Sequence, residues 1–169
     1  ATMSAPSTAR LDAALRRALA AAGAVIRRGF GRRFVVSHKG VVDIVTSVDR
    51  AAERAIVRVL RGAFPDHGFL MEESGERVAP SRYRWVVDPL DGTVNFAHGL
   101  PLSCVSIGLE KDGRPVLGGV LDPYRRELFT AGRGRGAHLN GRRIRVSATP
   151  RLLDALLVTG FPYDRYKKA

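Results

Sequence analysis

The stretch that most constrains this chain is a short apolar run ending in a pair of acids, Tyr83-Arg-Trp-Val-Val-Asp-Pro-Leu-Asp-Gly-Thr-Val-Asn-Phe96. Residues 84–87 include β-branched and aromatic side chains, which are typical of a buried strand. Asp88 and Asp91 follow at once, and Pro89 restricts the backbone between them. Gly92 permits a tight turn, and residues 93–96 can begin a helix. The sequence therefore predicts a strand, a turn with two carboxylates, and a helix.

This turn carries oxygen atoms of the kind that Mg²⁺ prefers. If the strand ends at Asp88, the carboxylates of Asp88 and Asp91 and the carbonyl of Leu90 can converge on one point, with water as the remaining ligands. The N–H groups after Gly92 would be free at a helix start, where phosphate binds. A second interpretation is an Asx-rich turn that caps a helix with solvated acids. The stretch alone leaves both interpretations open.

Two further acidic motifs stand upstream, in an order found in a known family. The segment Asp88-Pro-Leu-Asp-Gly-Thr-Val-Asn-Phe96 resembles the signature of the inositol monophosphatase family, which comprises Mg²⁺-dependent, lithium-sensitive phosphomonoesterases. That family has a Glu-Glu pair upstream, matched by Glu72-Glu73-Ser74, and an Asp-x-Val-Thr-x-x-Asp motif, matched by Asp43-Ile-Val-Thr-Ser-Val-Asp49. The resemblance runs from about Ala13 to Arg165. It does not reach the family's second half, whose Trp-Asp signature does not occur in this sequence.

The resemblance implies hydrolysis of a small phosphomonoester by water, with two Mg²⁺ ions, for which Mn²⁺ can substitute. The residues implied as metal ligands are Glu72, Asp88, Leu90 (through its carbonyl) and Asp91. Those implied to orient the attacking water are Asp49 and Thr93. Gly92 and Thr93 are expected to contact the phosphate, with Lys39 and Glu73 in supporting positions behind the ligands.

Several alternatives stay open. Asp49 also suits a simple acid in the first turn of a helix, where the helix dipole favours a carboxylate, and Lys39 suits a solvated turn. Inositol monophosphate is the leading substrate. Relatives with the same metal motifs act on sugar bisphosphates, histidinol phosphate or phosphoadenosine phosphate, so the motifs do not fix the substrate. Because the family takes another metal ligand from its C-terminal half, the 169-residue chain is expected to have little activity alone.

The rest of the chain predicts an α+β fold in which two helices pack on a largely antiparallel sheet. Apolar periodicity predicts helices from Ser7 or Thr8 to Gly29 or Gly31, and from Ser47 to Ala63. The predicted strands are 34–37, 41–45, 69–71, 84–87, 102–109, 116–121, 127–130, 137–139 and 143–146, followed by an apolar element at 152–159. The resemblance makes these the first layers of an αβαβα sandwich whose C-terminal half is absent. Residues 1–7 are predicted as a disordered tail and 8–169 as one metal-binding domain.

The net charge of +12 comes mostly from arginine. The adjacent arginine pairs are short and separate, with no aromatic residues interleaved as a stacking platform for bases. We therefore interpret the basic surface as one that attracts an anionic phosphoester. The alternative is a non-catalytic protein of the same fold that binds RNA or the transcription machinery.

Cysteine content and hydropathy bear on the compartment. Cys104 is the single cysteine, which excludes an intramolecular disulfide and fits a reducing cytoplasm. Its place in an apolar run predicts a buried, inert thiol. No apolar run approaches the roughly 20 residues that cross a bilayer, so no membrane partner is predicted. The resemblance implies a homodimer.

Overall fold

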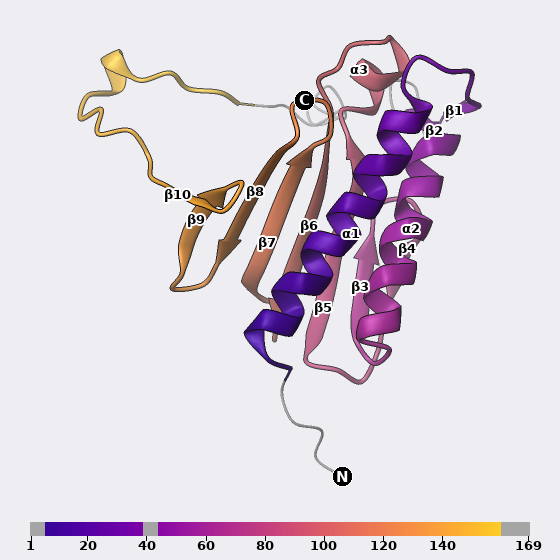
Figure 1. The fold of residues 1–169 in the computed structure, drawn as a ribbon, viewed down its shortest axis with the longest axis horizontal. Coiled ribbons are helices and arrows are strands. Elements are labelled where there is room, and N and C mark those ends of the chain that lie inside the picture. Colours follow the sequence, from indigo (N-terminus) through magenta and orange to yellow (C-terminus); the bar gives the residue numbers. More distant parts are fainter. Residues whose placement is uncertain (1–5, 39–43, 160–169) are drawn as a thin grey trace, which may run out of the picture.

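Two long helices pack on part of one face of an eight-stranded sheet in the computed structural model, which describes residues 6–38 and 44–159 (Figure 1). The strand order is β10-β9-β8-β7-β6-β5-β3-β4. β3 and β5 pair in parallel, and all other neighbouring strands of this sheet are antiparallel. The predicted class, two helices on a largely antiparallel sheet, is confirmed.

The helices follow the predicted apolar stripes closely. α1 spans Thr8–Gly29, and the Ser7 side chain caps it by accepting a hydrogen bond from the Arg10 N–H. α2 spans Ser47–Ala63, and a short α3 spans Thr93–Ala97. In the described parts of the chain, no helix combines the length and apolar content needed to cross a membrane.

The strands match the prediction in order, and their bounds differ at several places. β1 (Val36–His38) and β2 (Ile44–Thr46) form a separate antiparallel pair. The main sheet contains β3 (Gly68–Met71), β4 (Gly75–Arg77), β5 (Tyr83–Asp91), β6 (Cys104–Lys111), β7 (Arg114–Asp122), β8 (Glu127–Gly132), β9 (Gly136–Leu139) and β10 (Arg142–Ile144). β4 is absent from the prediction.

In the described part of the chain, both terminal segments of the prediction differ from the structure. In the predicted apolar element at 152–159 the only helix is a single 3₁₀ turn, η1 (Leu152–Asp154), and the large apolar side chains of the segment are exposed. Of the tail predicted over residues 1–7, residues 1–5 lie outside the described residues, and Ser7 serves as the cap of α1.

The core lies between the helices and one face of the sheet. On β5, Trp85 and Val87 point into it, whereas the alternate residues Arg84, Val86 and Asp88 are only half-buried. This period of two is that of a strand with one face covered. No described helix covers the opposite face, on which a shallow hollow of about 510 Å³ contains Glu72 and Asp88.

A histidine is buried in an aromatic stack at one end of this core. The His67 ring stacks on Phe64 at 4.6 Å and on Tyr83 at 5.0 Å between ring centroids. Its Nδ1 atom is buried without a hydrogen-bond partner among the described groups. Burial lowers the pKa of His67 from 6.5 to about 4, with the charge of Asp66 opposing this shift and that of Arg10 adding to it. The folded protein thus favours the neutral ring.

The stability of the fold should therefore fall in mild acid. Because unfolded His67 binds its proton near pH 6.5 and folded His67 only near pH 4, the free energy of unfolding falls as pH drops through this window and levels off below it. His67 is only 7 % exposed, and we expect a loss of about 2–3 kcal/mol. Urea unfolding across this range measures it. His67→Phe should flatten the pH dependence, and an unchanged slope in that variant would contradict the assignment.

Candidate active site

The two acids of the opening stretch lie inside strand β5, not after it. β5 continues to Asp91, and pairing with β6 places Asp88 opposite Ser106 and Asp91 opposite Cys104, with a register shift between them. The strand was expected to end at Asp88, and this expectation is wrong. A bulge accommodates Pro89, which has no N–H for the ladder. The bulge keeps both carboxylates at the strand end while β5 remains paired with its neighbour.

Glu72 and Asp88 form an acid pair because β3 and β5 run in parallel and end at the same edge. The Glu72 N–H donates to the Val87 carbonyl at 3.1 Å, which fixes the turn after β3 beside β5. Burial, then the hydrogen bond with Glu72 and the charges of Glu72 and Asp91, raise the pKa of Asp88 to about 8; the Leu90 N–H opposes this shift. At neutral pH the pair therefore holds a proton.

Asp91 is exposed, and its carboxylate lies beside the only cysteine of the sequence. Cys104 Sγ is 3.7 Å from Asp91 Oδ2. Burial, and then the negative charges of Asp91 and Asp88, raise the pKa of the Cys104 thiol to about 12. The thiol stays protonated at neutral pH, which agrees with the predicted lack of reactivity. Cys104 is half-buried, however, rather than fully buried.

These acids do not form a closed metal cage. Within residues 6–38 and 44–159, no group of three or more Asp, Glu, His or Cys side chains is arranged to hold a metal ion. Mg²⁺ is commonly bound through one or two carboxylates together with waters and substrate phosphates, rather than by an all-protein cage. A carboxyl pair open to a hollow, with a carboxylate and a carbonyl close by, has the donor chemistry that this ion requires.

Asp49 and Thr93, which are 44 residues apart, meet at the same end of the sheet. The Thr93 hydroxyl lies 2.8 Å from Asp49 Oδ1 and 2.9 Å from the Leu90 carbonyl oxygen, so its single proton is shared between two acceptors. Asp49 is only 1 % exposed. Figure 1 places α3 beside β1 and β2, at the end of the sheet where α2 begins. Thr93, which is half-buried, therefore contacts a carboxylate that is almost fully buried.

The two interpretations of Asp49 are not exclusive. Its Oδ2 atom accepts the Thr46 N–H at 2.9 Å and a short hydrogen bond from the Thr46 hydroxyl, while that hydroxyl accepts the N–H groups of Val48 and Asp49. This is a capping box at the start of α2. One carboxylate oxygen thus caps the helix, and the other faces Thr93.

Gly92 links the bulged strand to α3 in a conformation that other residues rarely adopt. Its φ is 87°, and a Cβ atom at this position would lie 2.7 Å from the Leu102 carbonyl oxygen. A side chain is therefore excluded both by the left-handed backbone and by close backbone packing. The expected phosphate contact of Gly92 remains a prediction.

Replacing Gly92 with alanine should reduce the free energy of unfolding by about 2 kcal/mol, since the cost of a left-handed alanine adds to the clash with Leu102. Gly113→Ala is the matched control. Gly113 has φ 72° with open space around its Cβ position, so only the backbone cost of about 1 kcal/mol applies. Urea unfolding of both variants tests this, and equal losses would show that the contact with Leu102 is unimportant.

Comparison with known proteins agrees with this arrangement. The model of the inositol monophosphatase family matches residues 8–169. The chain belongs to the inositol monophosphatase family. It is 48 % identical over 151 residues to inositol monophosphatase 2 of Solanum lycopersicum, covering 86 % of this chain and 57 % of that protein. It is 51 % identical over 152 residues to Nus factor SuhB of Pseudomonas aeruginosa, covering 87 % and 56 %.

A solved structure shares the fold of this chain. The extragenic suppressor protein suhB from Bartonella henselae superposes with a TM-score of 0.82 at 47 % identity, over 84 % of this chain and 56 % of that one. The chain thus spans a little over half the length of these relatives. The match confirms the family suggested by the three acidic motifs, and members of the family generally use divalent metal ions.

One buried acid next to this candidate site is missing from the sequence-based prediction. Glu53, on α2, is only 3 % exposed, and its Oε2 atom accepts the Glu73 N–H at 2.9 Å. The Ser74 hydroxyl donates a short hydrogen bond to its Oε1 atom. Glu53 therefore anchors the turn that carries Glu72. The sequence signal that could have revealed Glu53 is its place beside Ala52 and Ile56 on the apolar stripe of α2.

Only some of the remaining predicted site residues lie in the described part of the chain. Lys39 and Asp43 lie outside the described residues. Glu73 was predicted as a hydrogen-bonding partner behind the ligands; its backbone N–H donates to Glu53, and its supporting role remains a prediction. The structure thus brings together Glu72 with Asp88, and Asp49 with Thr93, at one end of the sheet.

Proposed function

We propose that this chain is the metal-binding part of a Mg²⁺-dependent phosphatase that hydrolyses a small phosphomonoester, with myo-inositol monophosphate as the first candidate substrate. The observation that carries the proposal is the contact between Thr93 Oγ1 and Asp49 Oδ1 at 2.8 Å, close to the bulge that bears Asp88 and Asp91. A helix cap alone does not require the second oxygen of Asp49 to face a hydroxyl. A relay for a proton does.

The proposed role of Thr93 is to pass a proton from water to Asp49. Asp49 is 1 % exposed and is hydrogen-bonded to the Thr93 hydroxyl, so the proposed path of the proton from water to this carboxylate runs through the threonine. The water O–H bond breaks, its proton moves to Thr93 Oγ1, and the threonine proton passes to Asp49 Oδ1. The water oxygen forms the new bond to phosphorus as the bond to the ester oxygen breaks. The leaving oxygen takes its proton from solvent.

The residues that would hold the divalent ions are Glu72, Asp88, Asp91 and the Leu90 carbonyl. Bound Mg²⁺ would stabilise the charge on the phosphoryl oxygens and make water more acidic. Asp88 must lose its shared proton to serve as a ligand, so metal binding competes with the hydrogen bond to Glu72. The Leu90 carbonyl has two lone pairs and can accept from Thr93 while it retains a second acceptor site.

The second candidate is a non-catalytic role in transcription, which the name of the Pseudomonas aeruginosa relative favours. The placing of Asp88, with its raised pKa, beside Glu72 at the edge of a hollow favours catalysis instead, because strongly shifted pKa values cluster at functional sites. The homodimer and lithium sensitivity that the family resemblance implies, and the cytoplasmic location inferred from the single cysteine, remain predictions.

The proposal is tested by measuring Mg²⁺-dependent phosphate release from myo-inositol 1-phosphate. Two proteins are compared: the 169-residue chain, and a chimera in which the tomato relative's sequence beyond its matched region follows this chain. We expect turnover in the range of about 1–10³ s⁻¹ for the chimera and little for the chain alone. Inositol monophosphatase 2 of Solanum lycopersicum, the parent of the chimera, is the positive control.

Three outcomes are informative. A chimera without Mg²⁺-dependent activity, beside an active parent, would overturn the phosphatase proposal. Full turnover by the chain alone would overturn the expectation that residues outside it are required. A chimera that releases phosphate faster from a sugar bisphosphate than from the inositol ester would keep the enzyme class and change the substrate.

A further inference from the structure

Every exposed long side chain on α2 is an arginine. The exposed positions of this helix are Ser47, Arg50, Arg54, Arg58, Arg61 and Gly62. The four arginines follow one another at spacings of four, four and three residues, so they lie along one side of the helix. At 1.5 Å per residue, they form a line about 16 Å long. We call these four residues the arginine ridge.

The charge of the ridge is not neutralised by neighbouring acids. Among the described residues, no carboxylate lies within ion-pair distance of any ridge arginine. The two acids of α2, Asp49 and Glu53, are buried and point toward the candidate active site. The positive charge on this side therefore has no internal counterpart in the described structure.

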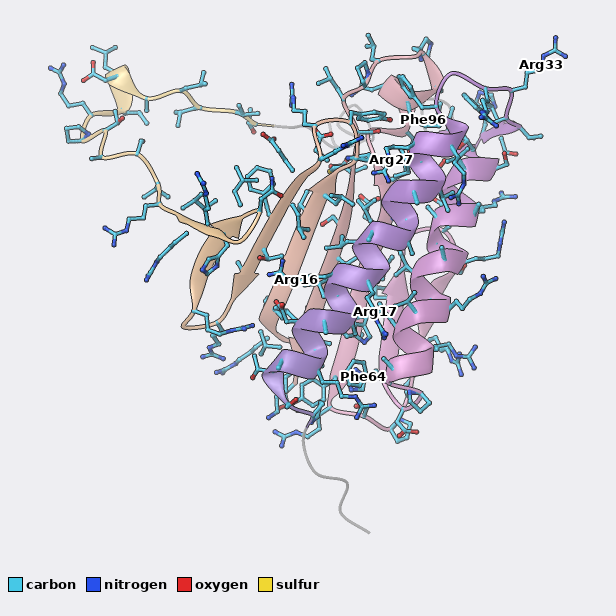
Figure 2. All side chains as sticks on the ribbon, viewed as in Figure 1. Arg16, Arg17, Arg27, Arg33, Phe64 and Phe96 are labelled. Atoms are coloured by element: carbon cyan, nitrogen blue, oxygen red, sulfur yellow. The ribbon has the colours of Figure 1, made fainter. Side chains whose placement is uncertain are left out.

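The neighbouring helix extends the same surface. Arg10, Arg17 and Arg28 of α1 are exposed, and α1 packs beside α2 on the same face of the sheet (Figure 1). Figure 2 shows Arg17 between the two helices on the side away from the sheet, with nitrogen-tipped side chains extending outward from α2. The outer face of the helix layer is thus basic over both helices. The sequence hides this because the ridge arginines are never adjacent.

We propose that the arginine ridge docks the phosphate backbone of a nucleic-acid duplex. Regularly spaced arginines on a rigid helix match a regularly spaced row of phosphates, and guanidinium groups bind phosphate oxygens in bidentate geometry. This surface is separate from the acids at the strand ends, so the proposal stands whether or not the chain is a phosphatase.

The chemistry of the ridge disfavours other partners. A membrane-binding helix carries large apolar residues that enter the lipid, and α1 and α2 expose none. Protein interfaces are centred on aromatic or apolar anchors, which are also lacking on this face. Proteins that bind single-stranded nucleic acid present aromatic rings on which bases stack, and α1 and α2 contain no aromatic residue. Arginine without these features suits a duplex backbone.

The expected binding is strong in low salt and independent of base sequence. Phosphate contacts determine affinity without reading bases. Four such contacts give a slope of log K against log[salt] of about −3.6, so affinity should fall roughly 100-fold between 50 and 200 mM KCl. Fluorescence anisotropy with short labelled DNA and RNA duplexes of arbitrary sequence measures this slope.

The decisive variant is R54Q/R58Q/R61Q. Arg50 is left in place because it follows Asp49 directly. Glutamine keeps the helix propensity of arginine, so fold and stability should persist, which circular dichroism verifies. The matched control is R133Q/R142Q/R145Q, which removes three exposed arginines from the β8–β10 region. Both variants lower the net charge equally.

We expect the α2 variant to weaken duplex binding by about 10-fold or more and to reduce the slope of log K against log[salt] by about 3. The control variant should keep most of the duplex affinity and most of the slope. Equal losses in the two variants would overturn the proposal, since the net charge alone would then account for binding. Tighter binding to a single strand of the same sequence would overturn it as well. The proposal would also be overturned if the arginine ridge bound phosphatidylserine vesicles or polyglutamate and the protein did not bind a duplex.

Discussion

Replacing Asp49 with asparagine should lower the kcat of phosphate release in the chimera by at least about 100-fold, with a much smaller change in KM. The carboxylate is buried, and its Oδ1 atom lies 2.8 Å from the Thr93 hydroxyl. An amide accepts a hydrogen bond there but cannot take up a proton. Thr93→Ala should have a similar effect, and the double variant should be little worse than either one, since the two residues act as a unit.

The control must separate catalysis from helix capping, because Asp49 performs both roles. Thr46→Ala removes the hydroxyl that caps the N–H groups of Val48 and Asp49 and that also donates to Asp49 Oδ2, at a cost of about 1 kcal/mol. It leaves the Asp49 Oδ1 atom in contact with Thr93, so we expect its kcat to fall far less than that of Asp49→Asn. A comparable fall in kcat for Thr46→Ala would assign the effect to structure, and a raised KM with unchanged kcat for Asp49→Asn would assign Asp49 to binding.

The places of Asp88 and Asp49 at the ends of a strand and a helix could be predicted, because strand and turn preferences depend on neighbouring residues in the sequence. The run before Asp88 predicts a strand whatever the rest of the chain does, and the apolar stripe of α2 places Asp49 in its first turn. The predicted end of this strand, at Asp88, was wrong for a physical reason. Proline usually ends a strand because it lacks an N–H, but a bulge lets β5 carry Pro89 and continue to Asp91.

Contacts between distant residues were not readable from local patterns. The parallel pairing of β3 with β5, which brings Glu72 to Asp88, depends on the whole sheet. The contact of Thr93 with Asp49 was implied only by the family resemblance. Glu53 was missed because its burial depends on the turn after β3, which lies about 20 residues away in the sequence. The arginine ridge was missed because spacing along a helix, not adjacency, brings charges together.

Removing the Asp88 carboxylate should abolish most of the metal affinity of the 169-residue chain. We expect Asp88→Asn to weaken Mn²⁺ binding by at least about 100-fold, since loss of a ligand should exceed the 10–100-fold cost of losing an outer partner. Asp112→Asn is the matched control, because Asp112 is an exposed acid paired with Arg82 at 2.5 Å, outside the candidate site. Calorimetric titration of Mn²⁺ into the three proteins measures the difference.

The raised pKa of Asp88 gives this experiment a second readout. Because that pKa is about 8, the carboxyl is mostly protonated at neutral pH and must release close to one proton when it binds the ion. Mn²⁺ affinity of the wild type should therefore rise about tenfold per pH unit up to pH 8, and titrations in buffers of different ionisation enthalpy should report the released proton. Asp88→Asn should lose both signals while Asp112→Asn keeps them. Equal Mn²⁺ affinity in the wild type and Asp88→Asn would remove Asp88 from the metal site.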